Sequence, residues 1–172
     1  MPILEHWQHL TPSDWEAFAK AWLAELRGSP LNPESDLPQM AVLMSYAAEL
    51  DPEWDLGMMV VMMNFTAVAD HQWQFIRAAV AHAESDDELG HIAAGPLEHL
   101  LGWHGEKFIT QVEQQAGADP KFARMLTGAW KYRMSDEVWA RVQAIQAGVP
   151  DPLSASDGES AIPPRPVNGT GT

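Results

Sequence analysis

Hydrophobic positions recur at the three- and four-residue spacing of amphipathic helices along most of this chain. In the first clear segment, apolar residues on one helical face follow Thr11-Pro12 and stop at Gly28. Threonine caps free backbone N–H groups, proline suits the first helical position, and glycine commonly follows the last helical residue. The pattern therefore predicts a helix between Thr11 and Gly28.

The same pattern predicts seven further helices. Their predicted starts, in chain order, are Leu37, Asp51, Asp70, Ser85, the residue after Gly105, Asp119 and Ser135. No stretch alternates apolar and polar residues with the period of two that marks a strand. About eight helices with short connections predict an all-α fold, either a bundle or a short stack of antiparallel helical hairpins.

The composition changes after residue 147. Residues 148–172 are rich in Pro, Gly, Ser and Thr and show no hydrophobic periodicity. We therefore expect one helical domain over residues 1–147 and a flexible, disordered tail over residues 148–172. Within this tail, Ile162-Pro163-Pro164-Arg165-Pro166 resembles a polyproline ligand, and a plain extended tail is the alternative.

Charge is concentrated in the first part of the chain. Residues 1–105 hold 16 acidic and 3 basic residues, a net charge of −13, while the whole chain carries −14. Such a surface repels nucleic acids and anionic membranes and attracts a basic protein partner. The alternative interpretation is that the acidity serves only solubility.

Several function classes lack their signatures in the sequence. The chain has no cysteine, which excludes a disulfide framework, a thiolate zinc site and a cysteine nucleophile. Its most apolar run, residues 57–65, is far shorter than the roughly 18 residues that span a bilayer. The N-terminus lacks the basic flank and apolar stretch of a signal peptide. We expect a cytoplasmic protein that does not act at a membrane.

The stretch HIAAGPLEHLLGWHG, residues 91–105, gathers three histidines and a glutamate. A zinc site on one helix needs ligands four residues apart, and His99 and His104 are five apart. Glu98 and His104 could exchange protons, but no nucleophile elbow or phosphate-binding loop accompanies them. We therefore assign no catalytic residue, no metal ligand and no cofactor.

A structural role explains more of this stretch. Pro96 cannot donate a helical hydrogen bond, so the helix should kink or end near Ala94. The small residues before it, including Gly95, should let another helix approach closely. Glu98 would then lie in the first turn of a new helix, near free N–H groups. Gly102 and Gly105 would allow the chain to reverse.

Aromatic and methionine residues suggest where a partner could bind. The chain has eight tryptophans, which could all lie in or over the core, but three of them are less clearly on the predicted core faces than the rest: Trp7, Trp103 and Trp130. We treat these three as candidate partner-binding residues. Four methionines between residues 58 and 63 surround their helix, which indicates a central buried helix or an adaptable binding face.

The segment from Asp86 to Val142 resembles an uncharacterised bacterial all-helical domain family. The resemblance rests on AAGPLEHLL (93–101), HGEKFI (104–109), DPKF (119–122) and VWARV (138–142). The family has no established activity, so the resemblance transfers no catalytic residue. It implies that five residues form a shared motif: Gly95, Pro96, Glu98, His104 and Gly105. Glu98 and His104 could form a structural hydrogen-bonded pair within it, or the motif could equally mark a functional site.

These observations favour a non-enzymatic, acidic protein-binding module, and an immunity, antitoxin-like or regulatory role fits them. A metal-binding protein or metal-assisted hydrolase that uses the histidines of the first 105 residues is the alternative. A structural scaffold or a DNA mimic is a further alternative, because the sequence does not show how the carboxylates are spaced on the surface. The oligomeric state is open.

Overall fold

The computed structural model describes residues 7–29 and 55–154, together with residues 41, 45, 48, 51 and 53. The described residues form helices and connecting turns without a strand, which confirms the predicted all-α class. The helix predicted from Leu37 to Leu50 lies outside the described residues apart from three positions. The tail beyond residue 154 also lies outside them.

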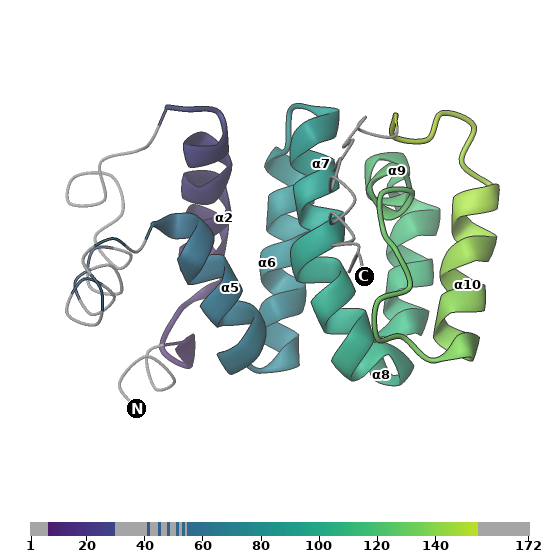
Figure 1. Cartoon of the computed structure of the whole chain (residues 1–172), viewed down its shortest axis with the longest axis horizontal. Coiled ribbons are helices and arrows are strands. Elements are labelled where there is room, and N and C mark those ends of the chain that lie inside the picture. Colours follow the sequence, from purple (N-terminus) through teal and green to yellow (C-terminus); the bar gives the residue numbers. More distant parts are fainter. Residues whose placement is uncertain are drawn as a thin grey trace, which may run out of the picture.

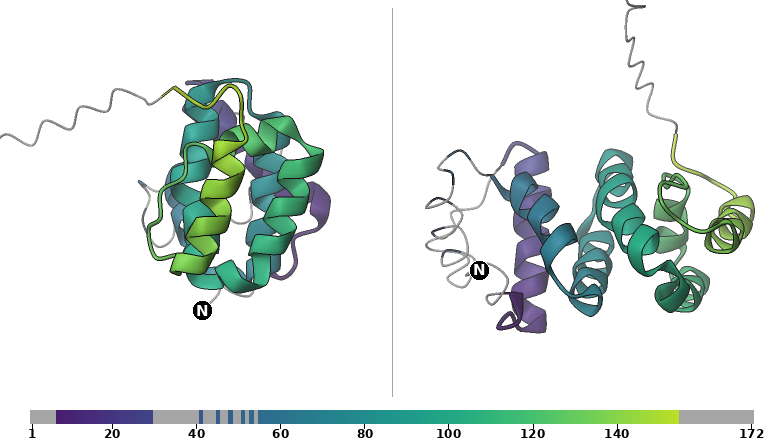
Figure 2. Two further views of the ribbon diagram at one scale, coloured as in Figure 1. Left: turned by 90° about the vertical axis from the view of Figure 1, so that its right-hand side faces the viewer. Right: turned by 60° about the horizontal axis from the view of Figure 1, so that its bottom comes forward.

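The helices stand side by side, and the chain alternates in direction along the row (Figure 1). Their bounds are α2 Pro12–Leu26, α5 Leu56–Thr66, α6 Ala69–His82, α7 Asp86–Ile92, η1 Ala93–Leu97, α8 Glu98–Ala118, α9 Pro120–Leu126 and α10 Asp136–Ala147. η1 is one turn of π-helix. Two further views show the same arrangement, which is a short stack of antiparallel helical hairpins (Figure 2).

Local capping chemistry places most helix ends. The Thr11 hydroxyl accepts a hydrogen bond from the Asp14 N–H, and the Asp14 carboxylate accepts one from the Thr11 N–H, which completes a capping box. Gly28 follows α2 with a φ of 72°, a left-handed conformation that glycine adopts without strain. The predicted caps Ser85, Asp119 and Ser135 are confirmed.

Two predicted starts are wrong. α5 begins at Leu56 rather than at Asp51, because the side chain of Asp55 accepts a hydrogen bond from the Met58 N–H. The carboxylate of Glu25 in α2 satisfies two more N–H groups at the same helix start. α6 begins at Ala69, so Asp70 lies inside its first turn instead of capping it.

One hydrophobic core runs through all the described helices. α2 packs along α6, where the Phe18 and Phe75 rings lie 4.9 Å apart. Farther along the row, the Trp73 ring contacts Phe122 at 5.6 Å and Phe108 at 6.1 Å. These aromatic contacts join α6 to α8 and α9, so the successive hairpins share their interior.

α5 covers one side of this core. Met59 and Met63 are fully buried, whereas Met58 on the opposite face is exposed. The methionines therefore do not mark a central buried helix, which was the first of the two interpretations of this run. They belong to a helix whose outer face is also apolar.

The joint at Pro96 differs from the prediction. The chain passes from α7 through η1 into α8 with helical backbone angles, so no helix ends near Ala94. The N–H of Glu98 donates to the Ala93 carbonyl five residues earlier, the bond of a π-turn. A wider turn accommodates the proline ring and its missing N–H without ending the helix. The predicted reversal is confirmed, because α8 kinks at His104, where φ is −132°.

The first residues of the predicted tail belong to the folded body. The Leu153 N–H donates to the Thr127 hydroxyl at 2.8 Å, and the Arg124 Nε donates to the Asp151 carbonyl at 2.9 Å. The Leu153 side chain packs against Gly128. The boundary predicted at residue 147 is therefore too early, since packing continues to at least Leu153.

Candidate functional site

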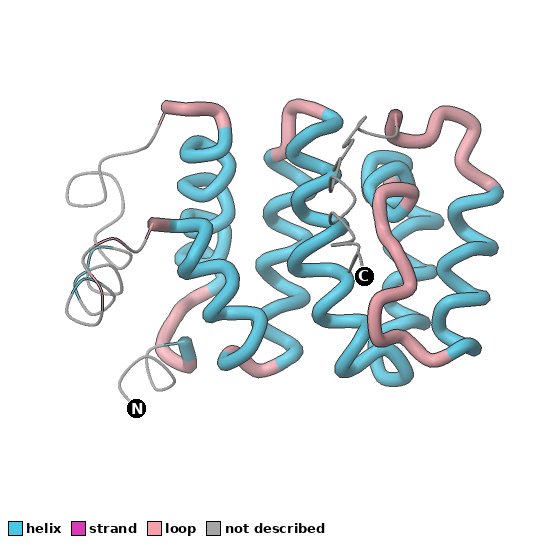
Figure 3. The backbone as a smooth tube through the Cα atoms, viewed as in Figure 1, coloured by secondary structure: helices cyan, strands magenta, loops and turns pink. Residues whose placement is uncertain are grey.

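Three residues of the 91–105 stretch, Glu98, His99 and Gly102, contact one loop, residues 127–135, which joins α9 to α10. In Figure 3 this loop descends between the hairpin of α7 and α8 and the helix α10. In the row of antiparallel helices, the loop occupies a position that a further helix would otherwise fill. Because a non-helical segment cannot satisfy its own backbone groups, its N–H and C=O groups need partners elsewhere.

Glu98 supplies one of these partners. Its side chain is 9% exposed, and its Oε1 accepts a hydrogen bond from the Trp130 N–H at 2.7 Å. Burial raises the pKa of Glu98, and the hydrogen bond from Trp130 opposes that shift only in part. The role predicted for Glu98 at a free helix start is wrong, because its neighbouring backbone groups are already bonded within the π-turn.

The side chain of Gln146 in α10 is a hydrogen-bond donor for two backbone carbonyls at and just before the start of the loop. Its Nε2 donates to the Leu126 carbonyl at 2.8 Å and to the Ala129 carbonyl at 3.0 Å. The loop is therefore held from α8 on one side and from α10 on the other. Sequence reasoning missed Gln146, because a glutamine on a helix gives no local signal of a partner about 20 residues away.

Two glycines let the loop and α10 approach α8 closely. A Cβ atom on Gly102 would lie 3.1 Å from the Tyr132 ring, and one on Gly105 would lie 2.9 Å from a methyl of Val138. Gly95 has no atom within 4 Å of such a position, so the close packing predicted there is wrong. Within the 91–105 stretch, the glycines with a packing role are thus Gly102, which is outside the five-residue motif, and Gly105, which belongs to it.

The predicted pair between Glu98 and His104 does not form. Glu98 is buried beneath the loop and bonded to the Trp130 N–H, whereas His104 is exposed at the kink of α8. His104 instead lines an open groove together with Trp103 and Arg133. The kink separates the two side chains that sequence spacing had grouped.

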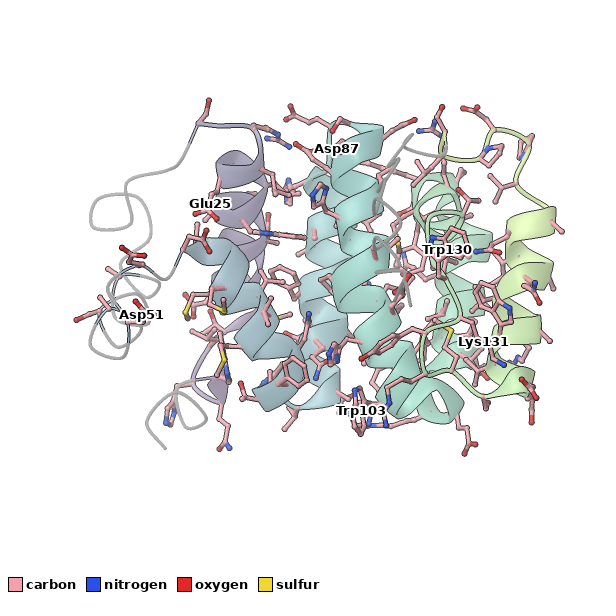
Figure 4. All side chains as sticks on the ribbon, in the orientation of Figure 1. Glu25, Asp51, Asp87, Trp103, Trp130 and Lys131 are labelled. Carbon is pink, nitrogen blue, oxygen red and sulfur yellow. The ribbon has the colours of Figure 1, made fainter. Side chains whose placement is uncertain are left out.

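Aromatic side chains that are exposed or half-buried lie on and around this loop. The Phe65 ring lies 4.3 Å from His99, and His99 lies 5.9 Å from Tyr132. Trp130 is 76% exposed two residues before Tyr132, and Trp103, which is 53% exposed, lies well below Trp130 in Figure 4, near the lower end of α8. We call these five residues, Phe65, His99, Trp103, Trp130 and Tyr132, the aromatic surface.

Charged side chains contact the residues of the aromatic surface and those next to it in sequence. The Arg133 guanidinium lies over the Trp103 ring at 4.3 Å, a cation–π contact. Burial lowers the pKa of His99, which keeps its imidazole neutral at pH 7. Lys131 forms an ion pair with Asp136 at the start of α10. The surface thus combines aromatic rings with one stacked cation.

Of the three tryptophans predicted to bind a partner, two are on this surface and Trp7 is not. Trp7 is 1% exposed, and its Nε1 donates to the Thr66 hydroxyl at 2.7 Å. Its ring stacks on Trp15 at 5.6 Å. Sequence reasoning also missed Phe65 and Tyr132, because the exposure of single aromatic residues depends on contacts between distant segments.

The backbone of the loop is strained at Tyr132. Its φ is 44°, the left-handed region that a bulky residue adopts only when its surroundings enforce it. The bonds to Glu98 and Gln146 provide that enforcement on the N-terminal side of the loop. The aromatic side chains are therefore presented from a fixed backbone.

The histidines are dispersed over the fold. His82 contacts Glu16 at 2.8 Å on one side of the molecule, and the His91 Nδ1 contacts the Asp87 carbonyl on α7. In the part of the chain that the structure describes, no group of three or more His, Asp or Glu residues could hold a metal ion. Within the same residues, no helix is both long enough and apolar enough to cross a membrane.

Fold and site together define an all-helical domain that presents aromatic side chains on a braced loop. The chain belongs to the family described as a family of unknown function (DUF6869), which matches residues 46–149. The predicted resemblance to a helical domain family without an established activity is thereby confirmed. Comparisons with curated proteins and with solved structures found no match.

Proposed function

We propose that this protein is a non-enzymatic binding module whose protein partner docks on the aromatic surface. The supporting observation is the exposure of Trp103 and Trp130 beside a loop that is bonded on both sides. Tryptophan, tyrosine and arginine dominate the residues that carry binding energy in protein interfaces. A surface fixed before binding also loses little conformational entropy when a partner docks.

The negative charge of the chain indicates which kind of protein partner it would attract. The net charge of −13 on residues 1–105 favours a basic protein, which long-range attraction would steer toward this chain. A compact acidic protein that neutralises a basic one fits an immunity, antitoxin-like or regulatory role. Aromatic contacts would then set the lifetime of the complex, and charge would set the rate at which it forms.

The test is capture from the native host by the full chain and by three variants of it. Trp103→Ala and Trp130→Ala remove rings of the aromatic surface, and Met58→Ala removes an exposed apolar side chain outside it. We expect one basic protein whose affinity falls at least about 30-fold in either tryptophan variant, the loss typical of a hot-spot residue. Binding should weaken between low and moderate salt and persist in Met58→Ala.

Melting temperatures of the three variants serve as the control for folding, since these side chains are exposed. A partner that binds both tryptophan variants as tightly as the original chain would refute the proposal. Capture that fails equally in Met58→Ala would also count against it, because the loss would then not depend on the aromatic surface.

A further inference from the structure

The aromatic surface has the chemistry that recognises extended proline-rich segments. Such segments dock on exposed Trp and Tyr rings, since proline rings pack flat on aromatic faces. A polyproline II helix is already extended when free, so its docking costs little conformational entropy. Trp103, Trp130 and Tyr132 place three such rings on and beside one loop.

This chain carries a segment of that kind. Residues 163–166 read Pro-Pro-Arg-Pro and lie outside the described residues. In a polyproline II helix of three residues per turn, Pro163 and Pro166 lie on one face, about 9 Å apart. Two proline rings on one face can therefore pack on Tyr132 and on Trp103, whose neighbour Gly102 lies against the Tyr132 ring.

The end of the described chain lies beside the loop that carries Trp130. Leu153 is hydrogen-bonded to Thr127, which precedes Trp130 by three residues, a span of at most about 11 Å. Pro163 follows Ser154 by nine positions, and an extended chain of that length spans about 30 Å. The segment therefore reaches the aromatic surface of its own chain.

Connectivity favours this occupant over the same segment of a second molecule. A site joined by a short connection experiences its ligand at an effective concentration on the order of millimolar. A second molecule in a dilute solution is present at micromolar concentration. Contacts that are too weak to hold two separate molecules together can therefore be sufficient to keep the segment bound to its own chain.

We propose that Pro163–Pro166 docks on the aromatic surface of its own chain, so that the partner must displace this segment to bind. The inference rests on the proposed function, because it identifies an occupant of the same surface. It adds a regulatory step, since the apparent affinity for the partner is lowered by the fraction of molecules whose surface is covered.

The test compares the full chain with a variant that carries Pro163→Ala, Pro164→Ala and Pro166→Ala. A matched control carries Ser156→Ala and Ser160→Ala, which change the same tail outside the proline segment. The readout is the NMR signal of each indole N–H, assigned with Trp103→Phe and Trp130→Phe. We expect the proline changes to shift the signals of Trp103 and Trp130 and to leave those of buried Trp7 and Trp15 in place.

A synthetic peptide of residues 158–172 completes the test. Added to the proline variant, it should restore both indole signals in a saturable way, and it should bind the original chain at least about tenfold more weakly because the surface is occupied. Indole shifts that depend on protein concentration would instead assign the segment to a second molecule and overturn the proposal. Identical indole signals in all three proteins would also overturn it.

These outcomes are separable from those of the proposed function. If the proline changes leave the indole signals unchanged while Trp130→Ala still loses the partner, only the docking of the tail is refuted. If Trp130→Ala keeps the partner, the proposed function is refuted whatever the tail does.

Discussion

Replacing Glu98 tests whether its carboxylate holds the loop in place. In Glu98→Ala the Trp130 N–H loses its acceptor 2.7 Å away, in a site where the Glu98 side chain is 9% exposed. A backbone donor left without a partner in such a site costs about 1–3 kcal/mol. For a chain of this length the melting temperature should fall by roughly 2–4 °C per kcal/mol.

Glu98→Gln separates hydrogen bonding from charge. A glutamine oxygen can accept the same hydrogen bond, but it carries no charge that burial would disfavour. Burial raises the pKa of Glu98 above its ordinary 4.5, with the Trp130 hydrogen bond opposing the shift. The stability that Glu98 contributes is therefore fully present below about pH 4.5 and declines as pH rises through its raised pKa.

The two variants should consequently diverge. At pH 7 Glu98→Gln should be at least as stable as the original chain, and its advantage should shrink as pH is lowered toward 4. Thermal unfolding from pH 4 to 8 measures this, and hydrogen exchange of the Trp130 amide reports the bond directly. Glu106→Ala, an exposed glutamate on the same helix, should change stability by less than about 0.5 kcal/mol.

The reasoning fails if Glu98→Ala melts at the temperature of the original chain with a protected Trp130 amide. It fails differently if Glu98→Gln is as unstable as Glu98→Ala at pH 7. The second result would mean that the charge, rather than the acceptor oxygen, holds the loop.

Two further substitutions test the packing and the ion pairs. Gly105→Ala should lower stability by about 1–3 kcal/mol in thermal unfolding, because its Cβ would lie 2.9 Å from a Val138 methyl. Gly90→Ala is the matched control: its Cβ would meet no atom within 4 Å, so it should instead stabilise α7 by about 0.5–1 kcal/mol. Although burial raises the pKa of Glu88, hydrogen bonds from Arg27 and backbone N–H groups hold it below 4.5. Glu88→Gln should therefore cost about 1–3 kcal/mol at pH 7, with the difference from the original chain vanishing as pH falls through that lowered pKa; a difference that persists at pH 2 would contradict this.

The sequence predicts the fold class because capping is local. Thr11 and Gly28 enclose α2 as expected, since each acts on backbone groups within a few residues. Pro96 shows the limit of local rules. Proline excludes one hydrogen bond, but whether the helix then ends or widens into a π-turn depends on the packing around it.

The site is less predictable because its contacts join distant segments. Trp7 is buried by a contact with Thr66, 59 residues away, and Glu98 binds Trp130, 32 residues away. Nothing near either residue in sequence indicates its partner. Its histidines, glycines and proline mark the stretch 91–105 as unusual in the sequence, but helical spacing alone does not indicate that its residues support a loop.

That support explains why so many restrictive residues gather in one stretch. Glu98 binds the Trp130 N–H, Gly102 makes room for the Tyr132 ring, and Gly105 admits α10 at the end of the loop. A loop that served only to connect α9 with α10 would not need a tyrosine in a strained left-handed conformation or a carboxylate whose charged form is disfavoured by burial. Their presence is better explained by what the loop displays. The residues that resembled an active site therefore position the loop whose rings we propose to bind the partner.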